Sequence, residues 1–217
     1  MNEKSEKPIH LAGVKLGRHR HVCAFFNDQD QEDKVIIPFL KEGIDRGERA
    51  FCISSAEMRT PLLQKLRDAG TEVEIAEKRD QLKIEQWGKT IVRSGRFDQD
   101  AMLARIEGVL SEGRAKGFGV TRLVGRMDWV REYSVGINEL AEYETQLNRI
   151  WQKFNDPIIC VYDLATFNAG ALVNILRTHP VAIVGDVVAE NPFFDPPEVV
   201  LQELNERSNE ADGRMDG

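Results

Sequence analysis

The sequence is poor in cysteine and lacks long apolar runs. Only three cysteines occur in 217 residues, and an odd number without framework spacing favours reduced thiols over a disulfide scaffold. No apolar stretch approaches the roughly 18 residues of a membrane-spanning helix. Residues 1–8 are polar and charged, which predicts no secretory signal. We therefore expect a cytoplasmic protein that has no membrane partner.

Positive charge is also scarce. Lys and Arg number 29 against 36 Asp and Glu, a formal net charge of −7. A protein that binds nucleic acid directly needs a basic face to displace counterions, so this balance argues against such a partner. The length predicts one domain with short tails. We expect a flexible arm over residues 1–17, a folded domain over residues 18–204 and a flexible tail over residues 205–217.

Familiar catalytic motifs are missing as well. The chain contains no Gly-x-Ser-x-Gly nucleophile elbow, no His-Glu-x-x-His and no EF-hand loop. We therefore predict no catalytic residue and no enzymatic activity.

Short apolar runs alternate with segments of helical periodicity. Buried strands are predicted at residues 21–26, 50–54, 122–125, 157–162 and 181–184. Helices are predicted between them, at residues 35–47, 55–70, 98–117, 135–154 and 168–178, and a last helix at 197–205. Residues 71–76 alternate like a more exposed strand, and residues 82–96 form a connecting segment. The alternation predicts an α/β fold with a three-layer, mostly parallel sheet and helices on both faces.

The first strand, loop and helix resemble the opening of RecA-like ATPases of the KaiC type, but the phosphate loop is missing. A Walker A loop needs glycines, whose backbone N–H groups close around phosphate, and a lysine that meets the outer phosphates. Residues 27–34 contain no glycine. They carry Asp28, Asp30, Glu32 and Asp33, which would repel phosphate, and Lys34 alone does not compensate. We predict a degenerate phosphate loop and no ATP binding.

Several segments together resemble the MEDS family, the methanogen/methylotroph, DcmR-type sensory domain. They lie at residues 21–27, 39–48, 125–129, 143–148, 160–163, 176–180 and 191–197, and the resemblance spans about residues 14–204. It implies a degenerate KaiC/RecA-like P-loop domain that senses small molecules, including hydrocarbon derivatives, instead of hydrolysing ATP. The family pattern often has Glu where this chain has Arg126, and Asp128 could restore the carboxylate.

Ligands of parallel sheets bind beyond the carboxyl ends of the strands, so polar residues there are candidates. His21 and Cys23 share one face of their strand, as do Cys160 and Tyr162, and the two pairs meet if the strands are neighbours. A small-ligand, metal or redox site and a plain buried core both remain open, but the spacing fits no zinc pattern, so we predict no metal and no cofactor. Trp129 walls a pocket or packs in the core, and Asp163 is a working carboxylate or a turn cap. The candidate ligand-binding residues are His21, Cys23, Asn27, Ser54, Arg126, Asp128, Trp129, Glu132, Cys160, Tyr162 and Asp163.

The combined interpretation is a non-enzymatic sensory protein. It binds a small ligand at the carboxyl edge of the sheet and signals through contacts with a regulatory protein partner, and a homo-oligomer is compatible with this. Two alternatives stay open. One is a vestigial nucleotide-binding KaiC-like protein, and the other is a ligand-free adaptor for a kinase or anti-sigma-type pathway.

Overall fold

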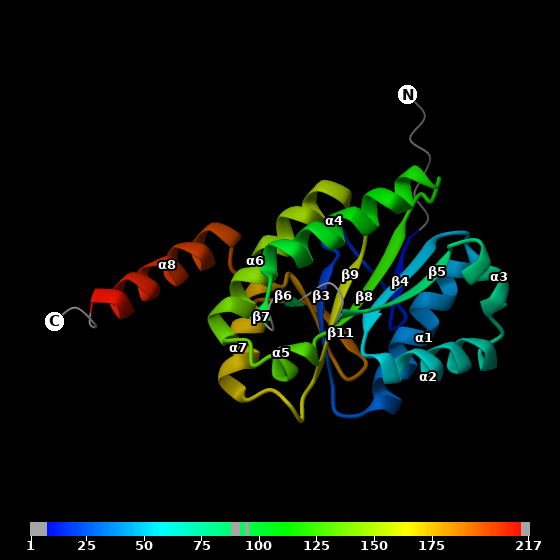
Figure 1. Ribbon diagram of the computed structural model, residues 1–217. Coiled ribbons are helices and arrows are strands. Elements are labelled where there is room, and N and C mark those ends of the chain that lie inside the picture. The colour runs from blue at the N-terminus through cyan, green and yellow to red at the C-terminus, as the bar shows by residue number, and fades with distance from the viewer. Residues whose placement is uncertain (1–7, 88–91, 94–95, 214–217) are drawn as a thin grey trace.

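A computed structural model describes residues 8–87, 92–93 and 96–213 (Figure 1). Its centre is a seven-stranded sheet of order β11-β10-β3-β9-β8-β4-β5. All neighbouring strands in it run parallel except β10 and β11, which form an antiparallel hairpin at one edge. The predicted, mostly parallel sheet is therefore confirmed. Its strands are β3 (His21–Phe26), β4 (Arg49–Ser54), β5 (Leu82–Gln86), β8 (Thr121–Arg126), β9 (Ile158–Asp163), β10 (Val181–Val184) and β11 (Val187–Glu190).

Helices cover both faces of this sheet and complete the three predicted layers (Figure 1). On one face α1 and α2 pack over the side chains of Val22, Ala24 and Phe26. On the other face α4, α6 and α7 pack over Cys23 and Phe25. Strands β3 and β9 are thus apolar along most of their length because alternate side chains enter two different cores. The helices are α1 (Gln29–Asp45), α2 (Ala56–Asp68), α3 (Val73–Lys78), α4 (Gln99–Ala115), α5 (Trp129–Glu132), α6 (Ile137–Phe154), α7 (Ala169–Thr178) and α8 (Pro197–Gly213).

Two predictions for the middle of the chain are wrong. The predicted strand at residues 71–76 is instead helix α3, in which Val73 and Ala76 are buried one turn apart while Ile75 is 42% exposed. Residues three apart are buried in this helix, and the short sequence pattern that they produce resembles the alternating burial of a strand. The predicted connecting segment at 82–96 begins with the edge strand β5, which pairs in parallel with β4. Within the rest of that segment, β6 (Val92–Arg93) is paired with β7 (Arg96–Phe97), and residues 88–91 and 94–95 lie outside the described part.

The predicted tails contain regular structure. From Pro8 onward the expected arm folds into a hairpin of β1 (His10–Leu11) and β2 (Val14–Lys15). Leu11 and Leu16 are buried against the core, so the prediction of a flexible arm is wrong for this half. Helix α8 continues past the expected boundary at residue 205 to Gly213. Residues 1–7 and 214–217 lie outside the described part. Within the described residues, no helix is long and apolar enough to cross a bilayer.

Candidate functional site

Four strands end at the same edge of the sheet, and α1 begins there. Strands β3, β4, β8 and β9 end at Phe26, Ser54, Arg126 and Asp163, and only Asn27 and Asp28 separate β3 from α1. This edge is the position at which parallel α/β sheets bind ligands. The candidate site is therefore built from strand ends and the first turn of α1.

The turn between β3 and α1 satisfies its own hydrogen-bonding groups. The carboxylate of Asp28 caps the helix by accepting the backbone N–H of Gln31 at 2.9 Å. The backbone N–H and side-chain amide of Asn27 both donate to Oε1 of Gln31, at 3.1 and 3.2 Å. Two backbone donors that a phosphate could use at this helix N-terminus, the N–H groups of Asn27 and Gln31, are therefore already bonded to side chains.

A buried ion pair crosses this edge from α1 to β8. The guanidinium of Arg126 pairs with Glu32, and it also donates to Asp128 at 2.9 Å and to the side chain of Gln29 at 3.2 Å. Burial raises the pKa of Glu32, and Arg126 opposes that rise. The carboxylates of Glu32 and Asp128 thus neutralise the positive charge of Arg126. Asp128 contributes to this edge by its ion pair with Arg126.

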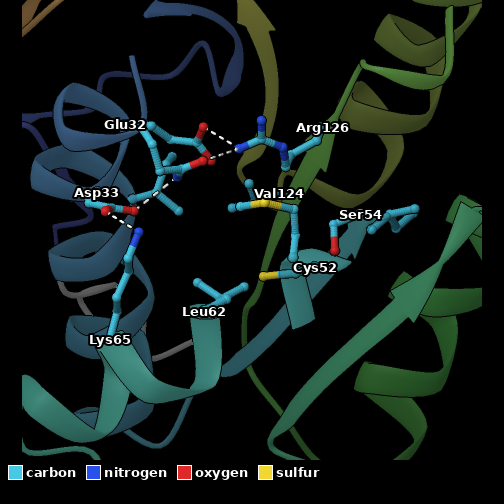
Figure 2. Close-up of a pocket in the computed structure, with 12 residues that line it drawn as sticks. Glu32, Asp33, Cys52, Ser54, Leu62, Lys65, Val124 and Arg126 are labelled. Carbon is cyan, nitrogen blue, oxygen red and sulfur yellow. Dashed lines mark hydrogen bonds and ion pairs between the residues drawn. The ribbon is translucent and has the colours of Figure 1, made fainter. Parts of the chain in front are cut away.

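An apolar cavity lies behind the ion pair, between α1, α2 and the ends of β4 and β8 (Figure 2). Figure 2 shows the pairs Glu32–Arg126 and Asp33–Lys65 on its rim, with Cys52 and Leu62 on its wall. Burial raises the pKa of Cys52 to about 12, so this thiol is neutral at pH 7. The space measures about 20 Å³, room for about one water molecule. Its apolar lining is formed by Ile36, Cys52, Ile53, Met58, Leu62 and Val124.

A second, more open cavity of about 230 Å³ lies on the other side of the same ion pair. It is bounded by Asn27 and Asp163 and shares Glu32 and Arg126 with the apolar cavity. Glu32 and Arg126 therefore line both spaces.

The structure places only part of the predicted set at this edge. Ser54 and Arg126 line the apolar cavity, and Arg126 also lines the open one with Asn27, Tyr162 and Asp163. Asp163 also caps its turn, since its carboxylate accepts the N–H of Ala165 at 2.8 Å.

Two further candidates lie away from both cavities. Trp129 is fully buried and stacks on Phe97, with the two ring centroids 4.6 Å apart, so it packs in the core. Glu132 is exposed and accepts the indole N–H of Trp87 at 3.3 Å. Of the predicted loop acids, Asp33 pairs with Lys65, whereas Asp30 and Lys34 are exposed on α1.

The remaining candidates gather in the core beneath α6. Strands β3 and β9 are neighbours, so side chains on the same face of the two strands can meet. Nε2 of His21 lies 3.6 Å from the sulfur of Cys160. Tyr162 donates its hydroxyl to the carboxylate of Glu144 at 2.6 Å. Cys23 lies on the same face of the sheet, beside Cys160, but its thiol donates to the carbonyl of Val181 at 3.6 Å. The predicted residues thus form two groups, of which only one lies at the carboxyl edge.

Sequence reasoning missed Glu144 and His179 as members of this buried group. The Nε2 atoms of His21 and His179 lie 3.3 and 3.4 Å from Oε2 of Glu144, and all three side chains are fully buried. Burial alone would raise the pKa of Glu144, but the two imidazoles hold it below its usual value. One signal was available: Glu144 and Asn148 are polar residues four apart on the otherwise apolar face of α6.

Comparison with known proteins identifies a family for this chain. The family model of the MEDS domain, described as the MEthanogen/methylotroph, DcmR Sensory domain, matches residues 20–180. The chain belongs to the MEDS family. It is 25% identical over 177 residues to the transcriptional repressor DcmR of Methylorubrum extorquens, a match that covers 81% of this chain and 64% of the repressor. This MEDS chain thus matches less than two thirds of the repressor's length.

Among solved structures, the MEDS chain is similar to a KaiC-like protein from Pyrococcus horikoshii OT3. The TM-score is 0.49 at 15% sequence identity, and the match covers 76% of this chain and 69% of the other.

Proposed function

We propose that this MEDS domain detects a small, largely apolar molecule in the cavity between α1, α2 and the ends of β4 and β8. The observation that supports this most is the contrast between the apolar wall and the charged rim of that cavity. Ligand sites in proteins combine an apolar lining with a few placed polar groups. The alkyl wall selects an uncharged ligand, and Ser54 supplies one hydroxyl that orients a polar substituent.

Signalling follows from how little free space the cavity has. A ligand larger than water needs Arg126 or Leu62 to move, so the bound and free states differ in the arrangement of α1, α2 and the β8 end. A ligand shifts such an equilibrium only through its different affinity for the two states. We infer that a partner protein reads this difference, in line with a regulatory role for the domain.

The turn at the start of α1 supports a non-nucleotide, non-enzymatic role within this proposal. The side chains of Asp28 and Gln31 accept two of its backbone N–H groups, and Asp30, Glu32 and Asp33 follow. Triphosphate would meet carboxylates where it needs free N–H groups. Nucleotide binding is the alternative that the experiment below can distinguish.

The test is a thermal-shift titration of the purified protein with one- and two-carbon alcohols, halogenated hydrocarbons of that size, and Mg-ATP. A ligand at 100 times its dissociation constant stabilises the fold by about 2.7 kcal/mol, which raises Tm by several degrees. We expect a saturable shift with at least one organic compound and none with Mg-ATP. A shift with Mg-ATP alone would establish the vestigial nucleotide site, and no shift at all would favour the adaptor.

Two matched variants locate the binding. Leu62→Phe adds bulk to the cavity wall, whereas Leu172→Phe adds the same bulk to a partly buried leucine on α7, on the other face of the sheet. We expect only Leu62→Phe to abolish the organic shift. Equal loss in both variants, or in neither, would contradict this location.

A further inference from the structure

Four potential metal ligands from four separate segments converge in the core beneath α6. His21 begins β3, Glu144 lies on α6, Cys160 lies in β9 and His179 follows α7. One ligand atom from each residue lies within 4.8 Å of every other, and all four residues are buried. This cluster is distinct from the cavity at the carboxyl edge.

The hydrogen bonds of the two histidines direct a lone pair from each ring into the cluster. Nδ1 of His179 lies 2.8 Å from the carbonyl oxygen of Ile175, which can only accept, so Nδ1 is the protonated nitrogen. Nδ1 of His21 lies 3.0 Å from Oδ1 of Asn148. The amide of Asn148 is oriented by its own NH₂ group, which donates to the carbonyl of Thr178 at 2.8 Å. Both Nε2 atoms are therefore free to bind a cation.

Within the cluster, the hydrogen bonds involve only the thiol of Cys160, which lies 3.5 Å from Oε2 of Glu144 and 3.6 Å from Nε2 of His21. Nε2 of His179 is buried and has no hydrogen-bond partner among the described residues. It nevertheless lies 3.4 Å from Oε2 of Glu144, and Nε2 of His21 lies 3.3 Å from the same oxygen. When both Nε2 atoms are unprotonated, their lone pairs repel this carboxylate oxygen, and a proton or a metal cation between them removes the repulsion.

Four of the six separations among the ligand atoms match the edges of a tetrahedral zinc site, and all six are within 4.8 Å. Zinc bonds of about 2.0–2.2 Å to N and O and about 2.3 Å to S place N and O ligands about 3.3 Å apart, and S about 3.6 Å from either. The N–O separations here are 3.3 and 3.4 Å. Sulfur of Cys160 lies 3.6 Å from Nε2 of His21 and 3.5 Å from Oε2 of Glu144.

We propose that His21, Glu144, Cys160 and His179 form a structural zinc site, which replaces the expectation, drawn from sequence spacing, that the chain holds no metal. Binding releases the thiol proton of Cys160 to solvent. Zn²⁺ with one thiolate, one carboxylate and two neutral imidazoles is then electrically neutral, as a buried site requires.

The surrounding contacts are those of a supported metal centre. Asn148 and the Ile175 carbonyl orient the two imidazoles, and the hydroxyl of Tyr162 holds the other carboxylate oxygen of Glu144 at 2.6 Å. Such outer partners fix ligand tautomers and ring orientations. Four protein ligands and full burial leave no open position, so the zinc ties α6 and α7 to β3 and β9 and is not catalytic.

The experiment removes and restores the metal. Because the site is buried, the full-length protein is unfolded in urea with chelator and reductant, and then refolded with no metal, with Zn²⁺ or with Co²⁺. For the protein refolded with metal, we expect elemental analysis to find one metal ion per chain. We also expect its Tm to be higher than that of the protein refolded without metal. The cobalt form should show a thiolate-to-cobalt charge-transfer band and the strong visible bands of tetrahedral geometry.

Cys160→Ser and Cys23→Ser make a matched pair, because both thiols are buried and the two residues pair across neighbouring strands. We expect the charge-transfer band to disappear in Cys160→Ser and to persist in Cys23→Ser. If Cys160→Ser does not fold, persistence of the band in Cys23→Ser and in Cys52→Ser assigns the sulfur instead. Substoichiometric metal in the wild type, or loss of the band with Cys23, would overturn the proposal. Neither result depends on whether the cavity at the carboxyl edge binds an organic ligand.

Discussion

A methyl group added at Gly43 should destabilise the fold, because α1 crosses a buried arginine at this residue. A Cβ atom at position 43 would lie 2.6 Å from Cδ and 2.7 Å from Nε of Arg122. The guanidinium cannot move aside without loss, because Nε donates to Glu48 at 2.6 Å and Nη1 donates to the Phe39 carbonyl at 2.6 Å and to Glu42 at 2.8 Å.

The magnitude follows from two opposing effects. Disrupting a buried ion pair costs about 3–5 kcal/mol, and alanine is better than glycine in a helix interior by about 1 kcal/mol. We therefore expect Gly43→Ala to lower the free energy of unfolding by about 2–4 kcal/mol. With an m-value of about 2 kcal/mol/M, the urea midpoint should fall by about 1–2 M.

The assay is equilibrium urea unfolding followed by tryptophan fluorescence, with Gly108→Ala as the matched control. Gly108 lies within α4, and the nearest atom to an added Cβ is Nη1 of Arg105 at 3.8 Å, an ordinary contact. This variant should be as stable as the wild type or up to about 1 kcal/mol more stable. Equal midpoints for the two glycine variants would refute the argument that Arg122 is fixed in place.

Two further predictions concern single carboxylates. Asp28→Ala removes the cap of α1 and should cost about 0.5–2 kcal/mol, whereas Asp30→Ala, at an exposed neighbour, should be nearly neutral; equal urea midpoints would contradict the capping role. Burial raises the pKa of Asp156 to about 6 from 3.8, so the native state binds this proton more tightly than the unfolded state does. The contribution of Asp156 to the free energy of unfolding should therefore rise, by up to about 3 kcal/mol, as pH falls from about 7 to about 4. Asp156→Asn should lack this increase. The wild type and the variant are unfolded in urea at both pH values, and a stability difference between them that is the same at both would contradict the prediction.

The sequence predicted the layers of the fold because the apolar patterns of the strands and of the helices are both strong in it. Strand 21–26 is apolar throughout and the helix at 135–154 has a clear apolar face, and both are present with small changes of boundary. Short elements were predicted poorly. Helix α3 has only one turn of buried residues, and strand β5 is recognisable as a strand only through its pairing with β4.

The candidate sites, like the fold, could be predicted from the sequence only in part. Which residues follow the strand ends can be determined along the chain, so Asn27, Ser54, Arg126 and Asp163 were placed at the carboxyl edge by sequence alone. The side chains that line the cavity with those residues come from α1 and α2. The spacing of residues along the chain does not predict these contacts.

Only the tertiary structure decided what His21 and Cys160 contact. Glu144 and His179 are far from His21 in sequence and lie on the elements that flank β9, and they meet because α6 packs over β3 and β9 while the end of α7 leads into β10. Local sequence determines secondary structure through the periodicity of burial. The chemistry of a buried cluster depends instead on long-range packing, which brings one side chain from each of several elements to the same point.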